Sequence, residues 1–100
     1  MKNKRRDKLQ VIANILKITK RGVKKTKIMY KANLSFTQLK QYLHFLLQRG
    51  LLKEENSTYY VTEKGLKLYE KYTELMGMLE VDHPKSPYAN GLAFSKFSYE

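Results

Sequence analysis

Side chains that could read the edges of nucleic-acid bases are gathered between residues 35 and 44. The amides of Gln38 and Gln41 could pair with adenine edges, and Lys40 could bind guanine or a phosphate. The candidate base-facing residues are Ser35, Thr37, Gln38, Lys40, Gln41 and His44. The same residue types would also suit the solvated polar face of a helix, so the pattern leaves two interpretations open.

Basic side chains that could hold phosphates precede this segment. Lys and Arg bind phosphates and position a protein on a duplex without reading its sequence. The candidate phosphate-binding residues are Arg5, Arg6, Lys24, Lys25, Lys27 and Lys31. Arg5 and Arg6, together with Lys2 and Lys4, could form a flexible basic arm over residues 1–8. This arm could neutralise phosphates without reading sequence, or it could reach into a groove of the duplex.

The charge of the chain is unevenly distributed. The net charge is +11, and residues 1–53 hold 15 Lys or Arg against the single acid Asp7. Residues 54–100 hold five bases and eight acids. Such asymmetry favours one positive surface that faces a polyanion such as double-stranded DNA. RNA, an anionic membrane surface and a merely solvated lysine-rich face are the alternatives.

The sequence lacks the residues that several kinds of chemistry require. The chain has no cysteine, which excludes a disulfide framework, a thiolate metal site and a cysteine nucleophile. The two histidines, His44 and His83, fall in different elements, and no carboxylate cluster or phosphate-binding glycine loop appears. We therefore expect no enzyme, no cofactor, no metal and no small-molecule substrate. Without a signal-like apolar run, we expect a cytoplasmic, nucleoid-associated protein that does not enter a membrane.

Periodic apolar residues and stop signals predict three helices before residue 50. The first covers about residues 5–20, with Leu9, Ile12 and Leu16 on its inner face and Gly22 after its end. The second is short, capped by Thr26 and ended by a left-handed Asn33.

The third predicted helix covers residues 35–49. Ser35 and Gln38 form a capping-box pattern at its start, and Gly50 follows its end. Its predicted inner stripe is Phe36, Leu39, Leu43, Leu46 and Leu47.

A β-hairpin and a last helix are predicted next. The runs 51–55 and 58–62 are prone to form strands, and Asn56 and Ser57 suit the turn between them. Thr62 can cap a helix over 63–80. The predicted fold is therefore mainly α with a small β-hairpin (α+β). Its order of three helices, two strands and a helix is that of a winged helix-turn-helix, which would insert helix 35–49 into the major groove.

The wing contributes less to this prediction. Its tip is Asn56-Ser57 beside Glu54 and Glu55, with Lys53 the one base nearby. We therefore expect the helix over 35–49 to dominate binding.

The stretch TKIMYKANLSFTQLKQYLHFLLQRGLL, followed by YYVTEKG, resembles small archaeal winged-helix proteins. The resemblance covers roughly residues 9–80, and its most specific parts are Gly50-Leu51-Leu52 and Thr62-Glu63-Lys64-Gly65. It implies DNA binding, in a chromatin-associated or regulatory role, and dimerisation through the C-terminal helix. The helix here is short for a long coiled coil, and the resemblance does not extend to the chain after Asp82.

Four regions follow from these patterns: the basic arm 1–8, a winged-helix domain 9–62, a C-terminal helix 63–82 and an aromatic tail 83–100. The predicted homodimer interface lies on the C-terminal helix, at Tyr69, Tyr72, Met76 and Leu79. The tail could dock or be disordered.

The function predicted from these regions is that of a transcriptional regulator or an architectural protein of chromatin. The alternative is a protein-docking module, because the winged-helix fold alone does not fix function.

Overall fold

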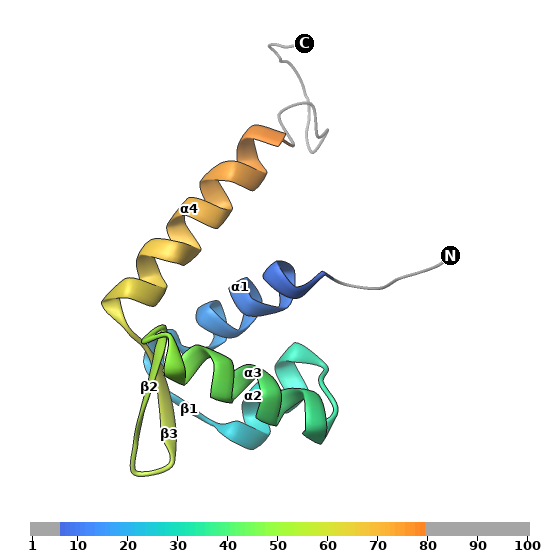
Figure 1. Ribbon diagram of the computed structural model, residues 1–100, viewed down its shortest axis with the longest axis vertical. Helices are drawn as coiled ribbons and strands as arrows, with labels where there is room; N and C mark the ends of the chain where they lie inside the picture. The colour runs from blue at the N-terminus through green and yellow to red at the C-terminus, as the bar shows by residue number, and fades with distance from the viewer. Residues whose placement is uncertain (1–6, 80–100) are drawn as a thin grey trace. The chain divides into compact units, whose positions relative to one another are not determined.

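The computed structural model describes residues 7–79 and consists of four α-helices, one short 3-10 helix and three short strands (Figure 1). The elements are α1 (Lys8–Ile18), η1 (Thr19–Arg21), β1 (Val23–Lys24), α2 (Lys25–Ala32), α3 (Phe36–Gln48), β2 (Leu52–Glu55), β3 (Thr58–Val61) and α4 (Glu63–Leu79). Of the described residues, 7–70 belong to one compact unit, and the rest of α4 belongs to a second. The mainly α fold with a small sheet is as predicted.

The start of α1 is fixed by a side-chain cap. The Asp7 carboxylate accepts a hydrogen bond from the Gln10 backbone N–H at 2.8 Å. The helix passes into η1 and stops at Gly22, whose φ of 85° is a left-handed conformation that suits glycine. The predicted inner position of Leu9 is wrong, because this side chain is 43% exposed in the first turn.

The short helix α2 begins two residues earlier than predicted. Lys24 is its N-cap and makes no side-chain cap, so the predicted cap at Thr26 is wrong. Lys24 instead ends strand β1, which fixes the extended backbone that precedes the helix. The predicted helix stop is confirmed, since Asn33 adopts φ 56° and ψ 56°.

The capping box of α3 is present as predicted. The Ser35 hydroxyl accepts from the Gln38 backbone N–H at 3.1 Å, and the Gln38 side-chain oxygen accepts from the Ser35 backbone N–H at 3.0 Å. The predicted inner stripe needs one correction. Phe36 is 56% exposed, because Leu39, Leu43 and Leu46 occupy the face of α3 that meets the core.

The hairpin is confirmed, and the sheet has one strand more than predicted. Strands β2 and β3 pair antiparallel, with Glu55 opposite Thr58. Asn56 and Ser57 both have positive φ, at 52° and 63°, as the favoured two-residue hairpin turn requires. Strand β1 adds to the other edge of β3, which gives the order β1-β3-β2.

The hydrophobic core lies among α1, α2, α3 and the inner ends of the hairpin. Its fully buried side chains include Ile15, Leu16, Ile28, Leu39 and Leu46. Thr19 is also buried, and its hydroxyl donates to the Ile15 carbonyl at 2.9 Å, so burial leaves no unsatisfied donor there. This core holds α2 and α3 together as the paired helices of a helix-turn-helix.

The two most specific sequence motifs meet where the hairpin closes and α4 begins. The Thr62 hydroxyl donates to the Gly50 carbonyl at 2.6 Å and accepts from the Gly65 backbone N–H at 3.0 Å. The Thr62 backbone N–H donates to the Leu51 carbonyl at 3.1 Å, and the Lys64 ammonium donates to the Arg49 carbonyl at 2.8 Å. The end of α3 and the start of α4 are therefore tied together, and Thr62 caps α4 as predicted.

Candidate nucleic-acid interface

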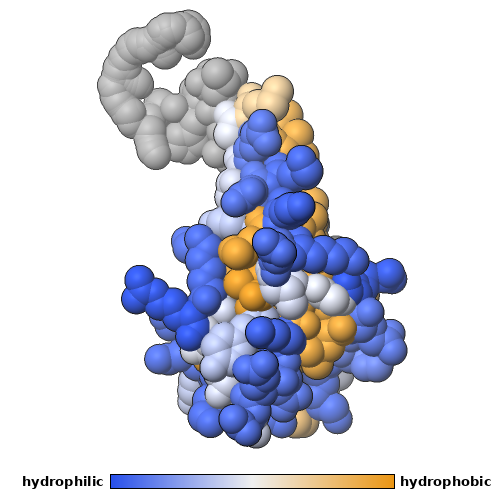
Figure 2. All heavy atoms as spheres, turned by 90° about the vertical axis from the view of Figure 1, so that its left-hand side faces the viewer, coloured by the Kyte–Doolittle hydropathy of each residue, from blue (hydrophilic) through white to orange (hydrophobic). Residues whose placement is uncertain are grey.

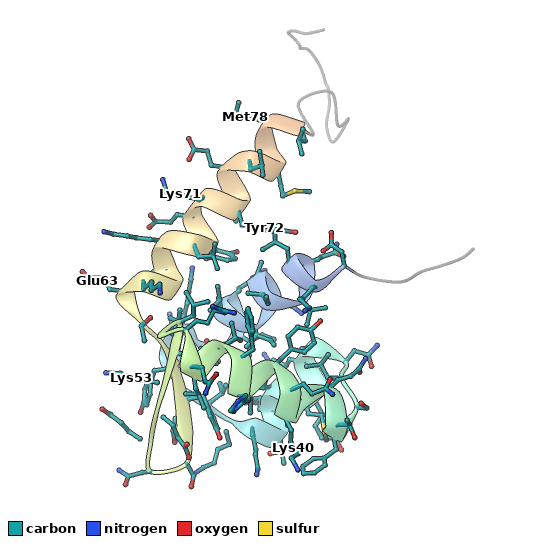
Figure 3. All side chains as sticks on the ribbon, in the orientation of Figure 1. Lys40, Lys53, Glu63, Lys71, Tyr72 and Met78 are labelled. Atoms are coloured by element: carbon teal, nitrogen blue, oxygen red, sulfur yellow. The ribbon has the colours of Figure 1, made fainter. Side chains whose placement is uncertain are left out.

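The outward face of α3 is polar along its whole length. Thr37, Gln41 and His44 are exposed on the side opposite the core-facing leucines, and Gln48 continues this face beyond the predicted set. Lys40 is exposed on the flank of α3 that is turned away from α1 (Figure 3). The structure therefore brings four predicted base-facing residues to one surface, where they could approach a major groove together.

Ser35 and Gln38 are exposed, but their side chains already make hydrogen bonds within the capping box. The Gln38 oxygen that accepts from the Ser35 N–H is the acceptor that a two-bond contact with adenine would need. Gln38 keeps its amide donors for other contacts. Of the two glutamines predicted to face bases, Gln41 is the one whose amide makes no capping bond.

A hollow of about 350 Å³ lies between the start of α1 and the other flank of α3. It is lined by Lys8, Gln38, Gln41, Tyr42 and Phe45. The Lys8 ammonium lies 5.9 Å from the centre of the Phe45 ring, and the Arg49 guanidinium lies 4.5 Å from it. Two cations therefore stand on this flank, and neither was among the predicted phosphate-binding residues.

The predicted lysines of the first helix-turn-helix segment are all exposed. Lys24 ends β1, and Lys25, Lys27 and Lys31 lie on α2. Neither α2 nor α3 contains an acidic residue, so both helices contribute positive potential to the surface. Arg5 and Arg6 lie outside the described residues, as does the tail from residue 83.

The wing carries charge of the opposite sign. Glu54 and Glu55 are exposed, and Lys53 forms an exposed ion pair with Glu55 at 3.7 Å. Burial, with a smaller contribution from the Glu54 carboxylate, raises the pKa of the Tyr59 phenol above its ordinary value. A hollow of about 240 Å³ separates Glu54 and Ser57 from Lys24 and Lys25 at the start of α2. Figure 2 shows how hydrophilic residues cover much of the face that carries the hairpin.

The predicted dimer residues fall into two groups. Tyr69 packs against the core of its own unit, and the Lys20 ammonium lies 5.0 Å from its ring centre. Tyr72 and Met76 are half-buried, and Leu79 is exposed. Leu75 and Met78 are exposed apolar residues of the same helix that were not in the predicted set. Tyr72 points to a different side of α4 from Lys71 and Met78 (Figure 3).

Residues 7–79 contain no helix that is both long and apolar enough to cross a membrane. The same part of the chain has no group of three or more His, Asp or Glu side chains arranged to hold a metal ion.

With this geometry in place, comparison with known families identifies the class of protein. The family model described as winged helix-turn-helix matches residues 5–80. The chain belongs to the winged helix-turn-helix family, and the resemblance found in its sequence is confirmed.

Three archaeal proteins are similar to this chain. Two uncharacterised proteins of Methanocaldococcus jannaschii are each 38% identical to it, over 79 and 76 residues, or 78% and 75% of this chain. The matched regions span 37% of the length of the first and 78% of the second. The crystal structure of Sso10a-2, a DNA-binding protein from Sulfolobus solfataricus, matches with a TM-score of 0.63 and 26% identity. This match covers 80% of the present chain and 92% of Sso10a-2.

Proposed function

We propose that this protein binds double-stranded DNA by placing α3 in the major groove. The observation that carries the proposal is the joint surface of α2 and α3, which has no acidic residue and combines exposed lysines with an exposed polar helix face. Polar side chains at the start of the second helix are the ones that reach base edges in a helix-turn-helix. The similarity to Sso10a-2, a DNA-binding protein, supports the same function.

The lysines and the wing have separate roles in this proposal. Lys24, Lys25, Lys27 and Lys31 hold phosphates on one side of α3, and Lys8 and Arg49 add charge on the other. The wing makes no phosphate contact in this proposal, because phosphates would repel the carboxylates of Glu54 and Glu55. Glu54 lines the same hollow as Lys24 and Lys25 and partly offsets their charge. Helix α3 therefore supplies the base contacts.

Two roles are compatible with this mode of binding. The uncharged Thr37, Gln41 and His44 favour a sequence-specific transcriptional regulator, because amides and hydroxyls discriminate between bases. The excess of lysine on the neighbouring helix favours an architectural protein that coats DNA. We propose the first role on the strength of the uncharged face of α3. In either role the protein binds as a homodimer joined through α4.

The experiment is a titration of a labelled random-sequence duplex, followed by fluorescence anisotropy at several salt concentrations. We expect tight binding that weakens steeply with salt, with a slope of about −0.9 per phosphate contacted. The double variant Lys27→Gln, Lys31→Gln should reduce that slope by about two contacts. Its matched control is Lys67→Gln, Lys71→Gln, which removes two exposed charges from α4 and should leave the slope unchanged.

Absence of binding at low salt would contradict the proposal and favour a protein-docking module. Preference for single-stranded or double-stranded RNA over the DNA duplex would favour RNA binding instead. Selection from a random pool then separates the two DNA roles, because a regulator enriches one sequence and an architectural protein does not.

A further inference from the structure

One large apolar side chain of α3 is exposed at the N-terminal end of this helix, the end that would lie deepest in the groove. Phe36 is the first residue of α3 and is 56% exposed. Its ring is covered on one side by the Lys40 ammonium, which lies 5.4 Å from the ring centre. Lys40 is four residues further along, so the two side chains stand one turn apart on the same flank.

The place of Phe36 in the helix-turn-helix limits what its ring can meet. The N-terminal residues of the second helix lie nearest the base edges. Thr37 is the next residue along α3, and Gln41 lies one turn beyond it. The apolar feature that a base pair presents in the major groove is the C5-methyl group of thymine, and a phenylalanine ring is a suitable partner for it.

We propose that Phe36 contacts a thymine C5-methyl group and is a specificity-determining residue of this protein. The inference rests on the proposed insertion of α3 into the major groove. Lys40 fixes the ring from one side and directs its own ammonium to a guanine edge or a phosphate. The remaining edge of the ring meets the methyl group, and the burial of both apolar surfaces favours thymine over an unmethylated pyrimidine at that position.

The charges around Phe36 favour DNA over an apolar protein surface as the partner. A hydrophobic partner would have to bury the Lys40 ammonium together with the ring, and burying an unpaired charge is costly. A groove lined by phosphates places an anion beside the ammonium while the ring meets the methyl group. The absence of acidic residues from α2 and α3 supports the same choice.

The test compares two A·T-rich duplexes of identical sequence, one with thymine and one with deoxyuridine, which lacks only the C5-methyl group. Binding is measured for the wild type, Phe36→Ala, Phe36→Leu and the control Tyr30→Ala. Tyr30 is an aromatic side chain of α2 that is 81% exposed, so its removal matches the loss of an exposed ring. Circular dichroism melting confirms that each variant is folded.

We expect the wild type to prefer thymine by about fourfold for each methyl group contacted, the effect of burying one such group. The Phe36→Ala variant should lose this preference and Phe36→Leu should keep most of it. Tyr30→Ala should keep the thymine preference of the wild type, whatever its effect on overall affinity. Equal preference in the wild type and Phe36→Ala would overturn the inference, as would equal affinity of the wild type for both duplexes. In both of these outcomes the protein still binds DNA in a salt-dependent way, so the proposed function stands while the role of Phe36 fails. If neither duplex is bound at low salt, the proposed function itself fails.

Discussion

At the scale of single residues, the polar side chains of α3 divide into two kinds. Ser35 and Gln38 hold the start of the helix through the capping box. Thr37, Gln41 and His44 are exposed on the helix face that points away from the core. A helix that reads bases needs both kinds, because its contacts are accurate only if its first turn is fixed.

This division predicts different consequences for two similar substitutions. Gln38→Ala removes half of the capping box and should lower the free energy of unfolding by about 0.5–1 kcal/mol. Gln41→Ala should change stability by less than about 0.5 kcal/mol, as expected for an exposed polar residue. It should relax base preference at one position of the selected site by about 1–3 kcal/mol. Urea unfolding and binding to a panel of single-base variants measure the two effects.

A loss of affinity that is the same for every duplex would show that Gln41 does not read a base. Unchanged stability of Gln38→Ala would show that the capping box contributes little to α3.

The sequence could predict the polar face of α3 but not the exposure of Phe36. The spacing of Phe36, Leu39 and Leu43 is that of one helix face, so periodicity predicts Phe36 in the inner stripe. The core is filled by Leu39, Leu43 and Leu46, and the first residue of the helix extends past it. Leu9 at the start of α1 is exposed for a similar reason. Periodicity describes direction around a helix, whereas exposure at a helix end depends on how far the core reaches.

At the scale of elements, local signals predicted the boundaries where a single residue determines them. Asn33 and Gly50 adopt the left-handed backbone that ends α2 and α3, and Thr62 caps α4. Strand β1 could not be predicted, because two residues carry no periodicity and their pairing with β3 is a tertiary contact. The start of α2 depends on that pairing, which explains why the cap predicted at Thr26 was wrong.

The junction between the hairpin and α4 depends on the small size of Gly65. A Cβ atom at this position would overlap the Leu51 carbonyl oxygen and lie 2.7 Å from a methyl carbon of Val61. Gly65→Ala should therefore lower the free energy of unfolding by about 1–3 kcal/mol, despite the better helix propensity of alanine. Chemical unfolding followed by circular dichroism measures this loss.

Gly77 provides the matched control in the same helix. A Cβ atom at Gly77 meets nothing within 4 Å in the structure. Gly77→Ala should stabilise α4 by up to about 1 kcal/mol and raise the helical signal. Equal effects of the two substitutions would show that the contact with Leu51 and Val61 does not hold the junction.

At the scale of the whole molecule, the uneven charge along the sequence places basic and acidic residues on different elements. The acid-free helices α2 and α3 form the proposed DNA surface, and the acidic residues other than Asp7 lie from the wing onward. Helix α4 carries three Glu and three Lys and so adds no net positive charge, which is consistent with a helix that serves assembly instead of phosphate binding. The sequence could predict this division because charge is a property of composition and needs no knowledge of packing.

The proposed dimer rests on an apolar stripe along α4. Tyr72, Met76 and Leu79 recur at intervals of four and three residues, the spacing of a helix-packing seam, and Leu75 lies beside them. Met78 is also apolar and is 70% exposed. It lies two helical turns beyond Lys71, on a different side of α4 from Tyr72 (Figure 3). Substitutions on the stripe and at Met78 therefore test whether dimerisation needs this stripe or only an exposed apolar side chain on α4.

We expect the double variant Tyr72→Glu, Met76→Glu to be a monomer by light scattering, because two carboxylates cannot be buried without partners in an apolar seam. Met78→Glu should remain a dimer, since its side chain lies off the seam. On a duplex carrying two half-sites, the monomeric variant should lose affinity more than on a single half-site, because a two-fold dimer presents two copies of α3. A monomeric mass for the wild type would contradict the proposed assembly. A dimer that survives the double variant would place the interface on another part of the chain.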